Sequence, residues 1–188
     1  MFFHAFILAM LAATTLAEEP SRALLAGDPL PDAAFVNAQG KAWRWSELRG
    51  KPFAFTFLFT RCPLPEFCPR LLANFAAAER ALEAAPIASG WRLVCLTLDP
   101  AFDTPKVLAA YAAPHRPDPE HWIFATGEPE ALDRLGTSLG LTVARTGELP
   151  VHNLRTVVVG SDGRIRKIFT GNEWRAEELV EELRRAAP

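Results

Sequence analysis

Two cysteines, Cys62 and Cys68, lie in the segment TRCPLPEFCPRLL, which spans residues 60–72. Five residues separate them, and three prolines stand between and directly after them. Two thiols so placed could close a structural disulfide, exchange disulfides with a partner protein, or bind a soft metal ion. The spacing differs from the C-x2-C of thioredoxin-type reductases and of most zinc sites. The two cysteines alone therefore leave all three kinds of site open.

The prolines around the cysteines predict the local geometry. Cys68 precedes Pro69 and is biased away from helical dihedrals, so we expect Cys68 at the N-cap of a helix whose first residue is Pro69. Pro63 and Pro65 exclude regular helix or strand between the thiols, which predicts a stiff loop that returns Cys62 to Cys68. A helix N-terminus favours the thiolate, which activates a cysteine for exchange or metal binding.

A third candidate ligand, His152, lies in the segment ELPVHNLRTVVV just ahead of a predicted core strand. Together with Cys62 and Cys68 it would supply two thiolates and one imidazole. Such a soft set of low coordination number suits copper as Cu(I) or Cu(II), and suits zinc less well unless a fourth ligand is added.

The remaining cysteine and histidines carry weaker expectations. Cys95 lies in the middle of an apolar run and is expected to be a buried, inert thiol. His115 and His121 stand in the Pro-rich segment HRPDPEHW and are expected to be solvated rather than to bind a metal. His4 belongs to the apolar N-terminal segment.

The elements that must position these residues alternate along the chain. Near-continuous apolar runs predict buried strands at 53–60, 91–98 and 121–126. Helical periodicity predicts helices over 69–85, from Thr104 as N-cap to about 113, over 128–140 and over 174–187. Hairpins are predicted at 34–45 and around Asp162-Gly163, with one helical turn at 46–50.

This order predicts an α/β protein with a mixed sheet flanked by helices, the thioredoxin-like fold, with an N-terminal β-hairpin. Cys62 then follows the first buried strand and Cys68 begins the next helix, at the sheet edge where reactive groups gather. In such a fold the loop that carries His152 packs against the loop that carries the cysteines.

The chain has 188 residues and a formal net charge of −2, and it has no basic stripe for nucleic acid. Residues 1–17 contain no Lys, Arg, Asp or Glu, which predicts a signal peptide or an uncleaved membrane anchor. A linker over 18–32 and one domain over 33–188 would follow. Export would place the domain in the periplasm or on the outer face of the inner membrane, where thiols are oxidised readily.

Three motifs then resemble the Sco/SenC family, exported thioredoxin-like proteins that bind copper and serve cytochrome c oxidase assembly. They are FTRCP, LDPAFDTP and HWIFATG, and the resemblance covers about residues 27–185. It implies that Cys62, Cys68 and His152 bind copper. The family's usual cysteine spacing is C-x3-C, whereas this chain has C-x5-C, so its copper affinity or redox potential is expected to differ.

Two functions follow from the resemblance. One is a copper metallochaperone that delivers copper to a respiratory oxidase subunit. The other is a thiol–disulfide oxidoreductase without stable metal, in which one of Cys62 and Cys68 attacks a disulfide of a thiol-bearing partner protein and the other resolves the mixed disulfide. A domain with a purely structural disulfide is the third interpretation. Peroxiredoxin chemistry is disfavoured. Peroxiredoxins use a Thr-x-x-Cys arrangement after this strand, whereas Thr60 stands only two positions before Cys62.

Overall fold

The aromatic run that predicts a buried strand forms the centre of the sheet. Strand β3, Phe53–Leu58, is buried at every residue. Strands β4, Arg92–Thr97, and β5, Trp122–Thr126, continue the sheet parallel to it. β3 ends two residues before the predicted boundary, because the backbone N–H of Cys62 bonds the carbonyl of Phe59 at 3.2 Å and turns the chain.

The structure is a computed structural model that describes residues 22–144 and 149–188. The predicted signal or anchor over 1–17, with His4, lies outside the described residues. None of the helices within the described ranges has the length and apolar character needed to cross a membrane.

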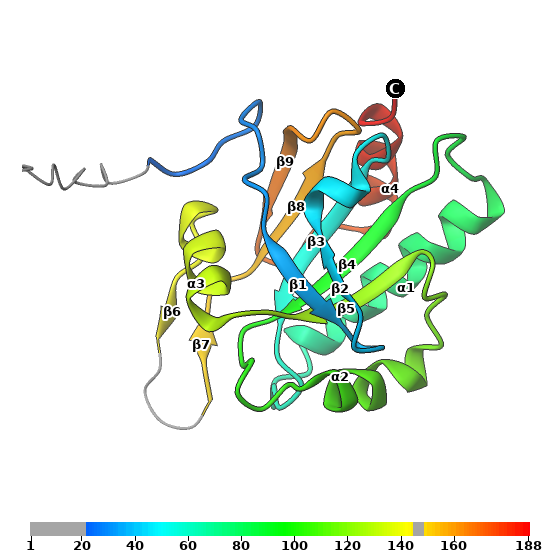
Figure 1. The fold of residues 1–188 in the computed structure, drawn as a ribbon. Coiled ribbons are helices and arrows are strands. Elements are labelled where there is room, and N and C mark those ends of the chain that lie inside the picture. The colour runs from blue at the N-terminus through cyan, green and yellow to red at the C-terminus, as the bar shows by residue number, and fades with distance from the viewer. Residues whose placement is uncertain (1–21, 145–148) are drawn as a thin grey trace, which may run out of the picture.

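The sheet is mixed, as predicted, with seven strands in the order β2-β1-β5-β4-β3-β8-β9 (Figure 1). The remaining strands form antiparallel hairpins: β1 Ala34–Asn37 with β2 Ala42–Arg44, and β8 Arg155–Val159 with β9 Ile165–Thr170. β1 pairs antiparallel with β5, and β8 pairs antiparallel with β3. Both predicted hairpins are therefore present at the two ends of the sheet.

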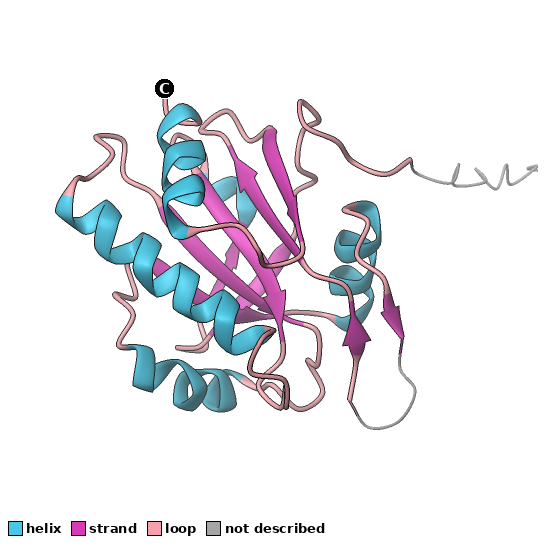
Figure 2. Cartoon of the chain, turned by 180° about the vertical axis from the view of Figure 1, so that it is seen from behind, coloured by secondary structure: helices cyan, strands magenta, loops and turns pink. Residues whose placement is uncertain are grey.

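Helices cover both faces of this sheet (Figure 2). One hydrophobic cluster packs a sheet face against α1 Cys68–Ala84, α2 Pro105–Ala112 and α4 Ala176–Arg185. A second cluster packs the other face against α3 Pro129–Ser138 and the 3-10 turn η1 Trp45–Leu48. A further 3-10 turn, η2 Ala113–His115, extends α2. The prediction of a mixed α/β fold of thioredoxin type is confirmed.

The start of α1 differs by one position from the prediction. Cys68 is the first residue of the helix, Phe67 occupies the cap position, and Pro69 is the second helical residue. Proline costs nothing there, because the first N–H groups of a helix have no intrahelical acceptor. The predicted cap of α2 is confirmed, since the Thr104 side chain accepts the N–H of Val107 at 3.4 Å.

A small two-stranded ribbon stands beside the main sheet and was not predicted. β6, Val143–Ala144, pairs antiparallel with β7, Val151–His152, and His152 lies opposite Val143. His152 therefore belongs to a strand of its own rather than to a loop. Two-residue strands leave no periodicity that a sequence could show.

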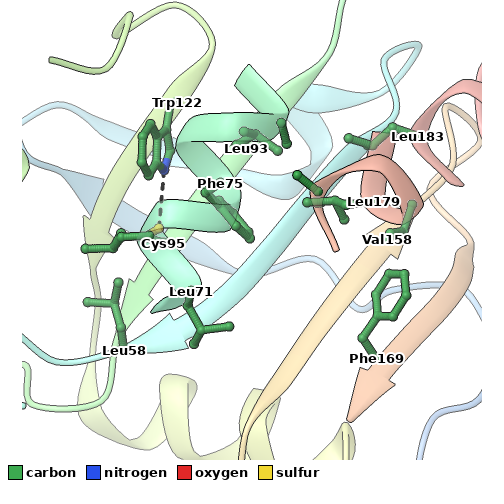
Figure 3. Packing of buried hydrophobic residues seen from close by; sticks show 14 of the residues in the cluster. Leu58, Leu71, Phe75, Leu93, Cys95, Trp122, Val158, Phe169, Leu179 and Leu183 are labelled. Carbon is green, nitrogen blue, oxygen red and sulfur yellow. Dashed lines mark hydrogen bonds between the residues drawn. The ribbon is translucent and has the colours of Figure 1, made fainter. Parts of the chain in front are cut away.

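The core beneath α1 contains the third cysteine (Figure 3). Cys95 of β4 is fully buried, and its sulfur accepts a hydrogen bond from the indole N–H of Trp122 at 3.3 Å. Burial raises the pKa of the Cys95 thiol to about 12. The prediction of a buried thiol is confirmed.

Candidate metal and thiol site

Cys62 and Cys68 meet at the C-terminal edge of β3. Cys62 follows the turn that ends the strand and is half-buried, whereas Cys68 begins α1 and is completely buried. Both are free thiols, and they lie close enough for Cys62 to affect the pKa of Cys68. The Pro-rich loop thus returns the chain on itself, as the sequence predicted, and places one accessible thiol against one sheltered thiol.

The electrostatics of Cys68 contradict the expectation that its helix N-terminus would activate it. Burial raises the pKa of the Cys68 thiol well above its usual range, and the contact with Cys62 raises this pKa further. A hydrogen bond from the backbone of Phe59 acts in the opposite direction but is the smaller effect. Desolvation of a buried thiolate outweighs the helix dipole here, because the dipole is equivalent to only about half a charge.

The third candidate ligand, His152 of β7, contacts Phe59, which follows β3. Its imidazole lies edge-on to the Phe59 ring, with the ring centroids 5.8 Å apart. Its Nδ1 lies 2.7 Å from the carbonyl oxygen of Asn153. A carbonyl only accepts hydrogen bonds, so Nδ1 carries the proton and Nε2 keeps its lone pair. Burial lowers the pKa of His152, which keeps the imidazole neutral.

One cavity of about 650 Å³ joins the cysteine loop to the segment around His152. Its wall is mostly apolar and comes from two stretches of the chain, namely Phe59, Cys62, Pro63, Leu64 and Phe67 with Leu149, Pro150, Val151 and His152. Leu64 is 47% exposed and Val151 63% exposed, so the mouth of the cavity is apolar as well.

The topology of the sheet explains why distant residues share this cavity. β8 runs antiparallel to β3 with Thr56 opposite Thr156, so the chain enters β8 at the edge where it leaves β3. His152 thereby lines the same cavity as Cys62. Within the described ranges, however, no three His, Cys, Asp or Glu side chains are gathered closely enough to hold a metal ion.

The loop between β4 and α2 holds the turn that carries Cys62. The Thr60 hydroxyl donates to Asp103 Oδ1 at 2.5 Å, and the Thr60 N–H donates to Oδ2 at 3.1 Å. The next residue, Arg61, donates to Asp99 at 2.7 and 3.1 Å. Both carboxylates belong to the LDPAFDTP motif, whose contacts could not be read from the sequence.

A second loop holds the other side of the cysteine segment. The side-chain amide of Asn172 donates to the carbonyl of Glu66, and Arg70 forms an ion pair with Glu173 at 3.3 Å. The side-chain amide of Asn74 also donates to the carbonyl of Trp174 at 2.9 Å. The chain is thus held before Cys62 by one loop and around Cys68 by another.

The expectation that His115 and His121 are solvated is wrong in part. Both are half-buried, because aromatic rings pack on them. His121 stacks on Trp91 with the centroids 4.3 Å apart, and His115 lies 6.0 Å from the Trp122 ring. Neither histidine lines the cavity that contains Cys62 and His152.

Comparison with known proteins places this arrangement among relatives. The family model described as SCO1/SenC matches residues 30–188. The chain is 27% identical over 143 residues to the SCO1 protein homolog of Bacillus subtilis (strain 168), covering 74% of this chain and 72% of that protein. It is 31% identical over 142 residues to a Stutzerimonas stutzeri protein named for copper binding, covering 73% and 67%.

Solved structures share the fold. BsSco, described as a member of the Sco family of cytochrome c oxidase assembly proteins with a disulfide switch, superposes with a TM-score of 0.74 at 25% identity over 88% of this chain and 96% of its own. Arabidopsis thaliana ScoI with copper bound superposes with a TM-score of 0.71 at 22% identity over 85% and 98%. The family model spans nearly all of the described chain, and the protein therefore belongs to the SCO1/SenC family.

Proposed function

We propose that this protein is a copper metallochaperone that binds one copper ion through Cys62, Cys68 and His152. The observation that carries the proposal is that Cys62 contacts Cys68 and lines the same cavity as the neutral imidazole of His152. Support comes from the relative named for copper binding and from the copper-bound ScoI of the same fold.

The proposed ligands differ in whether a proton must leave before copper binds. The neutral His152 offers the lone pair of Nε2, so binding to it releases no proton. The Cys68 thiol must lose its proton, and its raised pKa makes copper compete with that proton. Copper affinity should therefore increase with pH. Because the three side chains are not gathered closely enough to hold an ion, His152 and the thiols must approach one another on binding.

We further propose that the bound copper is cargo and passes to an oxidase subunit. BsSco, which shares the fold, belongs to a family of cytochrome c oxidase assembly proteins. A half-buried Cys62 at the wall of an open cavity would let an incoming partner ligand reach the ion. In this proposal the domain over 33–188 is exported, and residues 1–17 serve as its signal peptide or its anchor on the outer face of the inner membrane.

A second candidate function is thiol–disulfide exchange without stable metal. The pairing of an accessible Cys62 with a sheltered Cys68 favours it, as does the disulfide switch described for BsSco. The Cys62 thiolate would attack a disulfide of the partner protein and release one partner thiol. Cys68 would then attack Cys62, which leaves a Cys62–Cys68 disulfide and frees the second partner thiol.

Copper retention separates the two functions. The anaerobically reduced protein is loaded with Cu(I) and challenged with a strong Cu(I) chelator, beside Cys62→Ser and the matched control Cys95→Ala. One copper per chain in the wild type and the control, lost in Cys62→Ser, supports the chaperone. His152→Ala should weaken Cu(II) binding without unfolding the protein. A folded wild type that has free thiols and retains no copper would favour disulfide exchange.

A further inference from the structure

The turn that presents Cys62 is held mainly by side chains from another loop. Its only backbone closure in the described contacts is the 3.2 Å bond from the Cys62 N–H to the Phe59 carbonyl. Thr60 and Arg61 are the two central residues of this four-residue turn. Whatever fixes these two residues also fixes the direction in which the Cys62 side chain leaves the backbone.

Asp103 fixes the first central residue. Its carboxylate is completely buried and accepts two hydrogen bonds from Thr60, the hydroxyl bond at 2.5 Å and the N–H bond at 3.1 Å. Oδ2 also accepts the hydroxyl of Thr97 at 2.5 Å. Thr97 is the last residue of β4, so the carboxylate ties the turn to a core strand of the sheet.

The same loop fixes the second central residue. Arg61 donates two hydrogen bonds to Asp99, and its guanidinium lies 4.2 Å from the centroid of the Phe102 ring. The Asp103 N–H in turn bonds the Asp99 carbonyl at 2.8 Å. One short stretch of backbone thus carries both carboxylates and fixes their positions relative to each other.

A buried carboxylate is costly unless several hydrogen bonds compensate it. Here all three of the described donors that compensate it belong to the turn or to the strand beneath it. Displacing the turn would leave this buried carboxylate without two of its three described donors, so the contact resists displacement. Such an anchor is costly for a loop that carries no reactive group, and it suits one that must hold a sulfur in place.

We propose that Asp103 is a positioning residue for the thiol pair, which acts through Thr60 to hold the sulfur of Cys62 against that of Cys68. The inference rests on the proposed function only in taking Cys62 and Cys68 to act as a pair. It applies equally to copper binding and to disulfide exchange, because both require the two sulfurs to meet. Asp103 itself contacts neither sulfur in the described hydrogen bonds.

The equilibrium with glutathione measures this positioning without any metal. One glutathione disulfide oxidises the Cys62–Cys68 dithiol to the intramolecular disulfide and is itself reduced to two glutathione molecules. If the thiols are held together, the second step is efficient and the mixed disulfide of Cys62 with glutathione stays scarce. Quenching with acid and mass spectrometry count the dithiol, the mixed disulfide and the intramolecular disulfide.

Three variants separate positioning from loss of stability. Asp103→Ala removes all three hydrogen bonds. Asp103→Asn can keep them, because its amide oxygen accepts from the Thr60 N–H and the Thr97 hydroxyl while its NH2 donates to the Thr60 oxygen. Thr156→Val is the matched control, since it removes a buried hydroxyl that bonds Thr56 at 3.0 Å in the same sheet, on the strand pair β3–β8.

We expect Asp103→Ala to lower the equilibrium constant for the intramolecular disulfide about tenfold or more and to accumulate the mixed disulfide. Asp103→Asn should stay near the wild type, and Thr156→Val should not change the constant despite its lower stability. A wild-type constant in folded Asp103→Ala, or an equal decrease in Thr156→Val, would overturn the proposal.

If Asp103→Ala does not fold, Thr60→Val replaces it, because this variant removes one of the three hydrogen bonds and keeps the carboxylate. A partial decrease of the constant is then expected, and no decrease would count against Asp103. Failure of the wild type to retain copper would refute the chaperone function and would leave this comparison intact.

Discussion

The indole N–H of Trp122 donates a hydrogen bond to the sulfur of Cys95, 3.3 Å away, inside the core between α1 and the sheet (Figure 3). Both residues are buried, and the bond links neighbouring strands β4 and β5. The third cysteine of the chain thus has a structural partner. It serves the packing of the domain, whereas the other two meet at the sheet edge.

We therefore expect Cys95→Ala to destabilise the protein without affecting copper. The change removes a buried sulfur and leaves the Trp122 N–H without an acceptor, which should lower the free energy of unfolding by about 1–3 kcal/mol. Urea unfolding measures the loss, and the chelator challenge measures copper. Loss of copper from the folded variant would mean that Cys95 belongs to the metal site.

The native thiols should alkylate in a definite order. Cys62 is the half-buried one and should react with iodoacetamide first, whereas Cys68 is completely buried and its pKa is raised. Cys95 should also react after Cys62, since it is completely buried and burial raises its pKa to about 12. Peptide mapping after timed quenching gives the order, and urea should abolish the differences. Faster labelling of Cys68 than of Cys62 would contradict the assignment of the accessible thiol.

The stability of the protein should carry a pH signature of Glu79. This carboxyl is buried on α1 and accepts the N–H of Asp118 at 3.0 Å, and burial raises its pKa above the usual value. A raised carboxyl pKa means that the native state holds the proton more tightly than the unfolded chain does. The corresponding stability is present below about pH 4.3 and is lost as pH rises through the native pKa.

Glu79→Gln should remove that loss, because its amide oxygen can still accept from Asp118 while it carries no charge. The variant should equal or exceed the wild type in melting temperature at pH 7, and this advantage should shrink toward pH 4. Thermal unfolding at pH 4, 5.5 and 7 provides the test. A difference between the variant and the wild type that is the same at every pH would show that the ionisation of Glu79 is not the cause.

The apolar mouth of the cavity should matter for transfer to a partner and not for folding. Leu64 lines the cavity and is 47% exposed, so Leu64→Ser should change the free energy of unfolding by less than about 0.5 kcal/mol. Leu25→Ser is the matched control, because Leu25 is 62% exposed and does not line that cavity. In the proposed transfer of copper to an oxidase subunit, we expect a slower rate for Leu64→Ser alone. Equal transfer rates in the two variants would remove Leu64 from the partner surface.

Much of the fold could be predicted because its elements are distinct in composition. The run at 53–60 contains four phenylalanines and no charge, which suits only a strand covered on both faces. The Asp162-Gly163 dipeptide is an equally clear signal for a hairpin turn, and Gly163 adopts a φ of 80° in it. The ribbon of β6 and β7 could not be predicted, because its strands are two residues long and are set by pairing alone.

The sequence proposes the members of the candidate site, whereas the electrostatics of the site depend on the fold. The spacing of Cys62 and Cys68 and the position of His152 depend on chain order, which the sequence contains. The burial of Cys68 depends on how residues of α1 and the sheet enclose it, and it reverses the expected direction of its pKa. The burial and hydrogen bonds of Asp103 were hidden for the same reason, since an aspartate after a strand looks solvated until its donors are known.

The antiparallel entry of β8 beside β3 also sets the order in which the site can assemble. Cys62 and Cys68 are close in the chain and can meet in a nascent polypeptide, whereas His152 is made about ninety residues later. Pairing across such a separation is slow, because a long loop must close before its contacts form. An emerging chain therefore passes through a stage with a dithiol and no imidazole, in which premature oxidation competes with folding. Protection of the thiol pair during synthesis is thus a requirement that this topology imposes.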